Sequence, residues 1–218
     1  MTTDDAVTPT GSAPSPSSVR PGRGPGARDD VLVVAALAVE AAHVPPHLPL
    51  LLTGPGKVAA ATAVTTVLAA LPAGERPLVV GVGTAGALRD GLAGLHVPAR
   101  VVHHDISADA LARLGAPTTT ELVLDVLPGT TPGDVVLATG DVFVTEAPVR
   151  AAVARRAHLV DMEGFAVAWA CRALDARVVL AKHVSDGADE GAWDWVDAVE
   201  VSARALGEWL AEHLPPRG

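Results

Sequence analysis

The segment that decides the fold is Leu159–Asp189, which reads LVDMEGFAVAWACRALDARVVLAKHVSDGAD. A short apolar run ends at Val160, and Gly164–Leu174 is apolar at helical spacing. A second apolar run, Val178–Ala181, has the aliphatic character of a strand that is buried on both faces. The segment therefore predicts a strand, a helix and a second strand, in that order.

A carboxylate follows each of these two strands. Glu163 comes shortly after the first strand, and Asp186 comes shortly after the second. Ligands of open α/β sheets bind at the carboxyl ends of the strands, so both side chains are candidate site residues. Each also has an ordinary structural explanation, because a carboxylate stabilises a helix N-terminus and Asp commonly starts a turn.

The composition limits the class of protein. The 218 residues suffice for one domain with a large core. With 16 basic and 25 acidic residues the net charge is −9, which argues against nucleic acid or an anionic membrane as a partner. A single cysteine, Cys171, permits no internal disulfide, which favours a reducing cytoplasm. No apolar run reaches the ~18 residues of a membrane span, and the N-terminus lacks the apolar core of a signal peptide.

The chain divides into a tail and one domain. Residues 1–28 are rich in Pro, Gly, Ser and Thr, which predicts a disordered tail, and residues 29–214 form the expected domain. The expected strands are 31–36, 47–52, 78–82, 99–102, 134–138 and 178–181, and the expected helices are 57–71, 147–156, 164–174 and 193–214. Strands alternate with helices, so the class is α/β with a mainly parallel or mixed sheet.

The stretch Gly81–Gly86 matches the G-x-G-x-x-G pattern of dinucleotide-binding proteins, and Asp105 follows 19 residues later. In those proteins the motif opens a helix that faces the pyrophosphate. Here residues 87–97 contain two glycines and precede Pro98, so no full helix is expected and we reject this function. The glycines instead favour close approach of the backbone to a ligand, and Thr84 offers a hydroxyl.

Three other motifs fail as functional sites. Gly54–Lys57 lacks the first Gly and the Ser or Thr of a phosphate-binding loop. His103, His104 and His183 include no i, i+4 pair on a helix, so we expect no metal site. Ser185 is not in a G-x-S-x-G context, so it is not expected to be a nucleophile.

Six motifs together resemble one family. They are Ala36–Glu40, a strand end with a Glu; Thr53–Val58, similar to S/T-G-x-G-K-V; Gly83–Gly86, similar to G-[ST]-A-G; Thr139–Phe143, similar to [ST]-G-D-x-F; Asp161–Glu163, similar to E-M-E; and Val184–Asp186, similar to I-S-D. In this order, each at a strand end or helix start, they resemble the methylthioadenosine/S-adenosylhomocysteine nucleosidases of the nucleoside phosphorylase superfamily. The resemblance covers about residues 30–213.

The resemblance implies a three-layer α/β/α sandwich with a central mixed sheet, as in nucleoside phosphorylases. It also implies a cytoplasmic homodimer that uses no cofactor and serves methionine salvage. The implied reaction is hydrolysis of the N-glycosidic bond of adenosine-type thioether nucleosides, 5′-methylthioadenosine and S-adenosylhomocysteine, to release adenine.

The same resemblance assigns roles to individual residues. Glu40 would activate water, and Asp186, supported by Ser185, would protonate N7 of the leaving purine. Glu163 would bind the ribose 2′ and 3′ hydroxyls. The other implied contacts are Thr84 to the water, Phe143 stacked on the purine, the Val144 backbone at the purine edge, Met162 on the sugar, and Lys182 near the water and ribose. Acid assistance at the base and a base-activated water are the division of labour of inverting glycosidases.

The chain departs from the family pattern in two places. Lys182 stands where the family commonly has Arg, which changes the contacts available to the water and ribose. Only 12 residues separate Glu40 from Thr53, so a β-hairpin of the family is missing. Because such segments help to close the pocket around the 5′ substituent, the sequence leaves that group open.

Three alternatives remain open at this stage. Met162–Phe165 also resembles futalosine hydrolases, although these tend to carry Asn at the position of Asp186, which favours a 6-amino purine here. A purine nucleoside phosphorylase would need a cationic phosphate site, for which Lys57, Lys182, Arg89 and nearby histidines are candidates. A non-catalytic nucleoside-binding protein would bind the ligand without releasing adenine.

Overall fold

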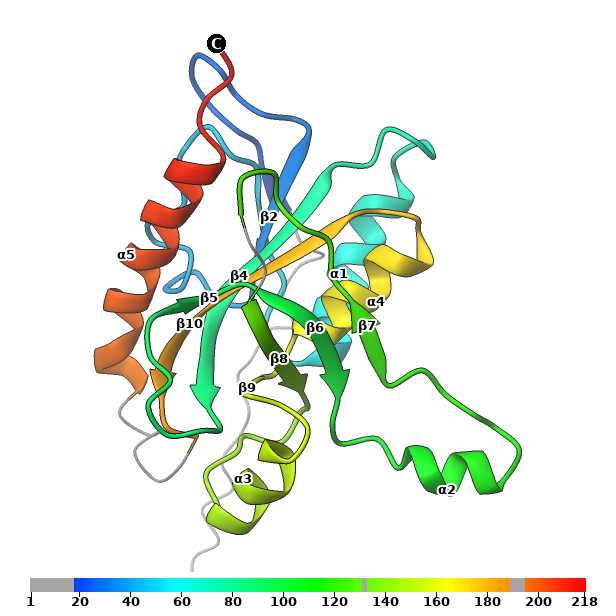
Figure 1. Ribbon diagram of the computed structural model, residues 1–218. Coiled ribbons are helices and arrows are strands. Elements are labelled where there is room, and N and C mark those ends of the chain that lie inside the picture. The colour runs from blue at the N-terminus through cyan, green and yellow to red at the C-terminus, as the bar shows by residue number, and fades with distance from the viewer. Residues whose placement is uncertain (1–17, 131–132, 189–194) are drawn as a thin grey trace, which may run out of the picture.

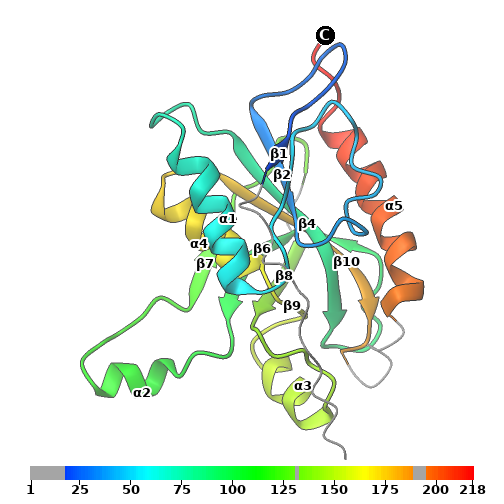
Figure 2. The same ribbon diagram turned by 180° about the vertical axis from the view of Figure 1, so that it is seen from behind.

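The structure is a computed structural model that describes residues 18–130, 133–188 and 195–218. In this part of the chain, ten strands form one sheet, with α1 and α4 on one face and α5 on the other (Figures 1 and 2). The strands are β1 (Val19–Arg20), β2 (Val31–Ala35), β3 (Leu50–Leu52), β4 (Leu78–Ala87), β5 (Leu95–His96), β6 (Pro98–His103), β7 (Glu121–Val123), β8 (Gly133–Thr139), β9 (Leu159–Asp161) and β10 (Val178–Asp186). The helices are α1 (Lys57–Ala69), α2 (Ala108–Arg113), α3 (Ala147–Ala154), α4 (Gly164–Ala173) and α5 (Trp195–His213).

The sheet is mixed. Its order is β1-β3-β2-β4-β9-β8-β6-β7, and β10 pairs with β4 and β5. The central pairs β2–β3, β2–β4 and β4–β10 are parallel, as are β6–β8 and β8–β9. The pairs β1–β3, β4–β9, β5–β10 and β6–β7 are antiparallel. The predicted three-layer α/β/α architecture with a mixed central sheet is confirmed.

The apolar core lies on both faces of the sheet. All five residues of β2 are buried, as expected for a strand covered by helices on both sides. On one face, α1 and α4 pack together through small side chains such as Ala60 and Ala63 of α1. On the other face, α5 packs against β10 and β4, and its Leu206 and Leu210 belong to the apolar cluster there. The two layers fix the strands whose ends form the site.

The strands β4 and β10 are longer than the sequence predicted. We expected them to end at Val82 and Ala181, where the apolar runs stop, but they continue to Ala87 and Asp186. The two strands pair with each other in parallel register along this extension. The hydrogen bonds of a strand are made by backbone groups and do not require apolar side chains. Glycines and polar residues can therefore lie inside these strands.

The N-terminal boundary expected at residue 28 also needs correction. Val19–Arg20 form β1, which pairs with β3. The Arg28 backbone N–H donates to the carbonyl of His47 at 3.1 Å, and the Arg28 side chain pairs with Asp30. Residues 18–28 are therefore held by contacts with the domain that their composition could not indicate. The rest of the predicted tail, residues 1–17, lies outside the described residues.

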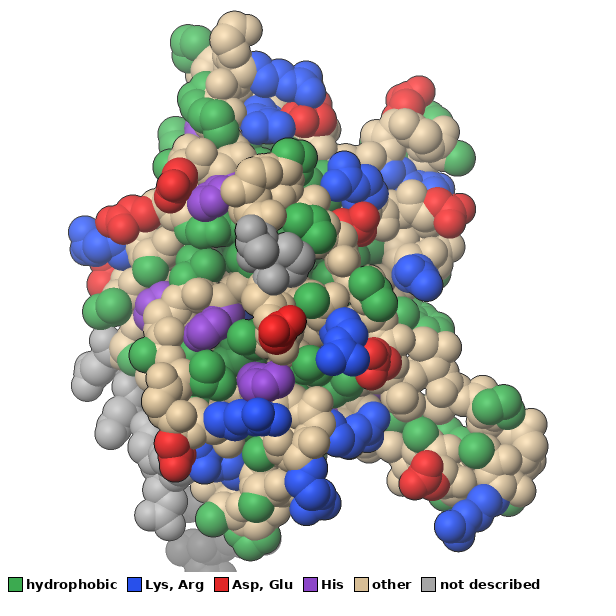
Figure 3. Space-filling model, viewed as in Figure 1, with side chains coloured by type: hydrophobic (Ala, Val, Ile, Leu, Met, Phe, Trp, Pro, Cys, Tyr) green, Lys and Arg blue, Asp and Glu red, His purple; other side chains and the backbone are tan. Residues whose placement is uncertain are grey.

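The polar segment after His103 contains two elements that the sequence did not predict, α2 and β7. The segment around α2 projects from the body of the domain, and none of the residues of α2 is buried (Figure 3). At the C-terminus, the predicted helix 193–214 is present as α5, and its first two expected residues lie outside the described part. No helix among the described residues is long and apolar enough to cross a membrane.

Candidate active site

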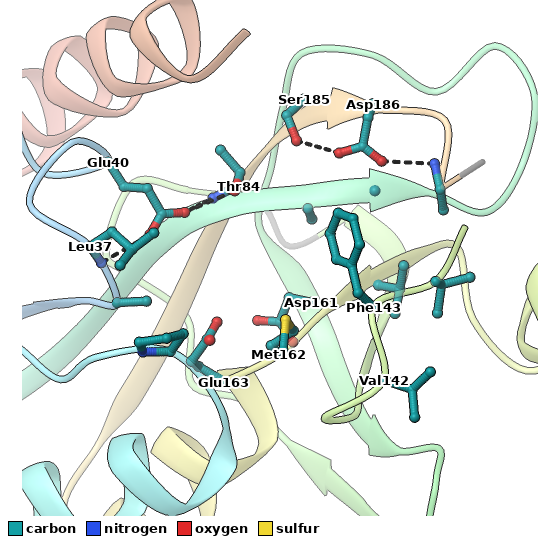
Figure 4. Close-up of a pocket in the computed structure, with 17 residues that line it drawn as sticks. Leu37, Glu40, Thr84, Val142, Phe143, Asp161, Met162, Glu163, Ser185 and Asp186 are labelled. Carbon is teal, nitrogen blue, oxygen red and sulfur yellow. Dashed lines mark hydrogen bonds between the residues drawn. The ribbon is translucent and has the colours of Figure 1, made fainter. Parts of the chain in front are cut away.

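A cavity of about 350 Å³ opens where several strands end (Figure 4). This volume suits a small organic ligand. The lining residues follow β2 and β8, precede α1, or lie at the ends of β4, β9 and β10. They are Ala36, Leu37, Glu40, Pro55, Thr84, Ala85, Gly86, Val142, Phe143, Val144, Val160, Asp161, Met162, Glu163, Ser185, Asp186 and Ala188. Apart from Lys182, every site residue expected from the sequence is in this set.

Glu40 lies in the turn after β2 and is 6 % exposed. Its Oε1 accepts hydrogen bonds from the backbone N–H and from the hydroxyl of Thr84, both at 2.8 Å. Its Oε2 accepts from the Leu37 N–H at 3.2 Å. These donors fix the carboxylate at the cavity wall, and a carboxylate held in this way can act as a general base.

Glu163 is the residue that immediately precedes α4. Its Oε1 accepts a hydrogen bond at 2.8 Å from the Gly56 N–H, which belongs to the start of α1. The carboxylate thus satisfies one N–H at a helix N-terminus, the ordinary structural function considered above. It also lines the cavity beside Met162 (Figure 4), so this hydrogen bond leaves the side chain at the cavity wall.

Ser185 and Asp186 form the end of β10. The register with β4 shifts between Val184 and Asp186, a bulge that redirects the side chains near it. The Ser185 hydroxyl donates to Asp186 Oδ2 at 2.7 Å, and the Ala188 N–H donates to Asp186 Oδ1 at 2.8 Å. Both carboxylate oxygens are therefore oriented, and the side chain lies at the cavity.

Two glycines of β4 leave room for these carboxylates. A Cβ at Gly83 would lie 3.1 Å from both Glu40 Oε1 and Lys182 Nζ. A Cβ at Gly86 would lie 2.9 Å from Asp186 Oδ1. The glycines of Gly81–Gly86 thus sit inside a strand and permit close approach of side chains, which agrees with the rejection of a dinucleotide motif.

The remaining walls are apolar. Phe143, which follows β8, is 43 % exposed and faces the cavity together with Val144 and Met162 (Figure 4). Leu37 and Pro55 add apolar surface that the sequence did not predict as part of the site. An aromatic ring and a thioether offer flat, polarisable surfaces suited to a purine and a sugar.

Lys182 does not line this cavity. It is 4 % exposed and lies under the cavity floor, where its Nζ is 2.9 Å from Asp161 Oδ2. Strand residues alternate between the two faces, and the continuation of β10 turns Lys182 toward the α4 side. In this structure Lys182 contacts Asp161, and its contact with a ligand stays a prediction.

Asp161 is a site residue whose function the sequence did not predict. Its Oδ1 accepts from the Thr139 hydroxyl at 2.5 Å, and its Oδ2 accepts from the Gly164 N–H at 2.9 Å. The carboxylate therefore links β8, α4 and, through Lys182, β10. The feature of the sequence that could have indicated Asp161 as a site residue is its position directly after a buried apolar run and just before a helix.

Burial and neighbouring charges shift two pKa values at this site. Burial, with repulsion from Asp161, raises the pKa of Glu163 to about 7, against the opposing effect of Lys182. Burial alone would lower the pKa of Lys182, but the surrounding carboxylates outweigh it and the pKa is raised. Lys182 is thus a cation that offsets the negative charge of the pocket.

The candidate histidines have other environments. His103 Nε2 lies 2.7 Å from Lys57 Nζ and 2.9 Å from Asp105 Oδ1, and its ring stacks on Phe165. His104 Nε2 is buried against Gly140 and has no hydrogen-bond partner among the residues that the structure describes, and burial lowers the pKa of His104. Within the described part of the chain, no three His, Cys, Asp or Glu residues are grouped so that they could hold a metal ion.

The sequence model of the phosphorylase superfamily matches residues 47–214, which is most of the chain. The chain belongs to the phosphorylase superfamily. This assignment confirms the resemblance at the level of the superfamily. A search of curated proteins found no match to the sequence.

Solved structures share the fold of this superfamily member. A Helicobacter pylori MTAN mutant with 5′-methylthioadenosine in the active site aligns with a TM-score of 0.73 at 19 % identity, covering 86 % of this chain and 98 % of the other. Native futalosine hydrolase of H. pylori aligns with a TM-score of 0.72 at 21 % identity, covering 84 % and 96 %. The 5′-methylthioadenosine/S-adenosylhomocysteine nucleosidase of Neisseria meningitidis, complexed with methylthio-immucillin-A, gives 0.70 at 22 % identity, covering 85 % and 100 %.

Proposed function

We propose that this protein is a purine nucleosidase, which hydrolyses the N-glycosidic bond of adenosine-type thioether nucleosides and releases adenine. The observation that carries the proposal is the convergence of Glu40, Glu163 and Asp186, from three separate strand ends, in one cavity with Phe143. The similar solved structures are those of nucleosidases and a futalosine hydrolase, which agrees with this assignment.

The chemistry explains why the site needs these residue types. When a purine leaves, positive charge develops on the ribose ring. Glu163 would accept hydrogen bonds from two adjacent hydroxyls and complement that charge. Glu40, held by Thr84, would accept a proton from the attacking water, while Asp186 would deliver a proton to N7. Phe143 would stack on the purine between them.

The carboxyl group of Asp186 favours adenine as the leaving base. A protonated carboxyl donates to N7, and a carboxylate oxygen accepts from the exocyclic amine of adenine. A 6-oxo base presents an acceptor at that place, which an amide donor would match better. Futalosine hydrolysis remains the second candidate, because a futalosine hydrolase shares the fold.

The charge of the cavity favours hydrolysis over phosphorolysis. The lining set contains Glu40, Asp161, Glu163 and Asp186, and among the described residues it contains no Lys, Arg or His. Of the three Lys and Arg candidates for a phosphate site, Lys182 pairs with Asp161 and Lys57 pairs with Asp105. The third, Arg89, reaches the carbonyl of Ala154. A phosphate dianion would meet carboxylates without a compensating cation.

A substrate panel tests the proposal. The nucleosides are 5′-methylthioadenosine, S-adenosylhomocysteine, adenosine, inosine and futalosine, each with and without phosphate, with the released base identified by chromatography. We expect adenine from the thioether nucleosides at a rate that phosphate does not change. Hypoxanthine from inosine, or fragmentation of futalosine alone, would support the second candidate. Binding without release of any base would support a non-catalytic nucleoside-binding protein.

We also propose that two copies of the chain associate, as the resemblance implies. None of the residues of α2 is buried against the rest of the domain, and Leu114, which follows the helix, is 80 % exposed. Trp169 on α4 is another exposed large apolar side chain. Light scattering should give the mass of a dimer, and Leu114→Asp should lower that mass; a monomeric protein would contradict this proposal.

A further inference from the structure

Arg150, a residue of α3, holds the turn that follows Asp186. Its Nε donates to the carbonyl oxygen of Gly187 at 2.8 Å and lies 3.4 Å from that of Ala87. Its Nη2 pairs with Asp90 at 2.8 Å. The guanidinium therefore joins the ends of β10 and β4 from outside the cavity, since Arg150 is not a lining residue.

The turn that Arg150 holds has an uncommon backbone conformation. Ala188 has φ of +50°, which non-glycine residues adopt infrequently. The same residue is 1 % exposed, and its N–H orients Asp186 through Oδ1. Such a conformation persists only when the surrounding structure fixes it, and the hydrogen bond from Arg150 to Gly187 is one such constraint.

The same helix is connected to the expected base-stacking residues. The loop with Phe143 and Val144 leads directly into α3. Val144, Val153 of α3 and Ala188 belong to one apolar cluster. The loop with Phe143 and Val144 and the turn after Asp186 thus both pack next to α3. Arg150 provides a polar contact from this helix to that turn.

We propose that Arg150 is a positioning residue for Asp186, which sets the place of the carboxyl relative to the purine by holding the Gly187 carbonyl. The proposal rests on the function proposed above, in which Asp186 is the acid. Arg150 itself touches no substrate and transfers no proton. Its removal should therefore affect the chemical step more than the binding of the nucleoside.

The first test compares variants on 5′-methylthioadenosine. Arg150→Met should lower kcat about 10- to 100-fold while KM changes less than about 3-fold, because small displacements of a catalytic group are costly. Arg150→Lys should recover part of the loss, since it keeps the charge and a donor. Arg155→Met, at an exposed arginine just after the same helix, is the matched control and should behave as the unmodified protein.

The second test is a double-mutant cycle with Asp186→Asn, in which adenine release is followed at high enzyme concentration. If Arg150 acts through Asp186, then Arg150→Met should cost less than about 2-fold when Asp186 is already Asn. A purely structural role would produce the same loss in both backgrounds. If Arg150→Met does not fold, as judged by thermal unfolding, Arg150→Lys takes its place in the cycle.

The outcomes separate this inference from the proposed function. Loss of activity in Asp186→Asn together with unchanged kcat in Arg150→Met would overturn the inference alone. Equal losses for Arg150→Met in both backgrounds would also overturn it. Near-native adenine release by Asp186→Asn would overturn the assignment of Asp186 as the acid and with it this inference, while leaving the nucleosidase activity itself in place.

Discussion

Lys182 Nζ lies 2.9 Å from Asp161 Oδ2 beneath the floor of the cavity, where the two side chains are 5 % and 1 % exposed. Around this pair, Asp161 accepts from Thr139 and from the start of α4. Glu163, two residues further on, faces the ligand side. The pair thus supports the carboxylates of the pocket, with Asp161 at the lining of the cavity and Lys182 behind it.

Lys182→Met should destabilise the protein by about 3–5 kcal/mol, because it leaves the Asp161 carboxylate buried without its cation. Urea unfolding measures this loss. The double variant Lys182→Met/Asp161→Asn is the control and should be more stable than Lys182→Met. A loss below about 1 kcal/mol, typical of exposed ion pairs, would show that the pair is not as buried as described.

The raised pKa of Glu163 should make stability depend on pH. The folded-state pKa is about 7 and the ordinary value is 4.5, so between these values the folded protein binds more protons than the unfolded chain. Stability should therefore fall as pH rises from about 4.5 to about 7 and then level off. Glu163→Gln should lack this component. The free energies of unfolding of both proteins between pH 4.5 and 8 give the comparison, and a constant difference across that range would refute the raised pKa.

Glu163→Gln should also weaken catalysis. The variant keeps the size of the side chain but removes the charge that complements the developing cation, which predicts a loss of order 2–4 kcal/mol in transition-state stabilisation. The measurement is kcat/KM for 5′-methylthioadenosine. An unchanged kcat/KM would limit Glu163 to its structural hydrogen bond with Gly56.

Glu40→Gln should bind an adenosine-type ligand while turnover falls by about 10²-fold or more, because the amide keeps the shape but cannot accept the proton of water. Calorimetry measures binding and adenine release measures turnover. Val39→Ala, at an exposed neighbour, is the control. An active Glu40→Gln enzyme would assign water activation to another residue.

Removal of residues 18–28 should lower stability, whereas the first 17 residues should be dispensable, since they carry none of the motifs. A chain that begins at Ser18 should keep the Tm and activity of the full protein. A chain that begins at Asp29 loses β1 and the hydrogen bond from Arg28 to His47. A loss of about 1–2 kcal/mol would lower Tm by roughly 2–8 °C. Equal Tm values would show that β1 adds no stability.

The sequence predicted the parts of the site that depend on local pattern. Apolar runs locate buried strands, and a carboxylate directly after such a run lies at the sheet edge where ligands bind. This reasoning places Glu163 and Asp186 correctly beside the cavity. The position of Glu40 after the first strand made it a third candidate carboxylate, and the family resemblance added Phe143, whose local sequence is less informative.

The parts that the sequence missed depend on partners distant along the chain. The extension of β10 comes from its pairing with β4, and it turns Lys182 away from the cavity. The pairing of β1 with β3 likewise cannot be read from a Pro- and Gly-rich segment. Arg150 is an ordinary helix residue until the fold brings it to Gly187.

The most direct test of the central claim is hydrolysis of 5′-methylthioadenosine in ¹⁸O-labelled water without phosphate, with both products analysed by mass spectrometry. The account predicts adenine together with a free thioether ribose that carries one ¹⁸O at the anomeric carbon, and formation of both products about 10²-fold or more slower with Glu40→Gln. Release of adenine only when phosphate is present, with a ribose 1-phosphate as the second product, would contradict it.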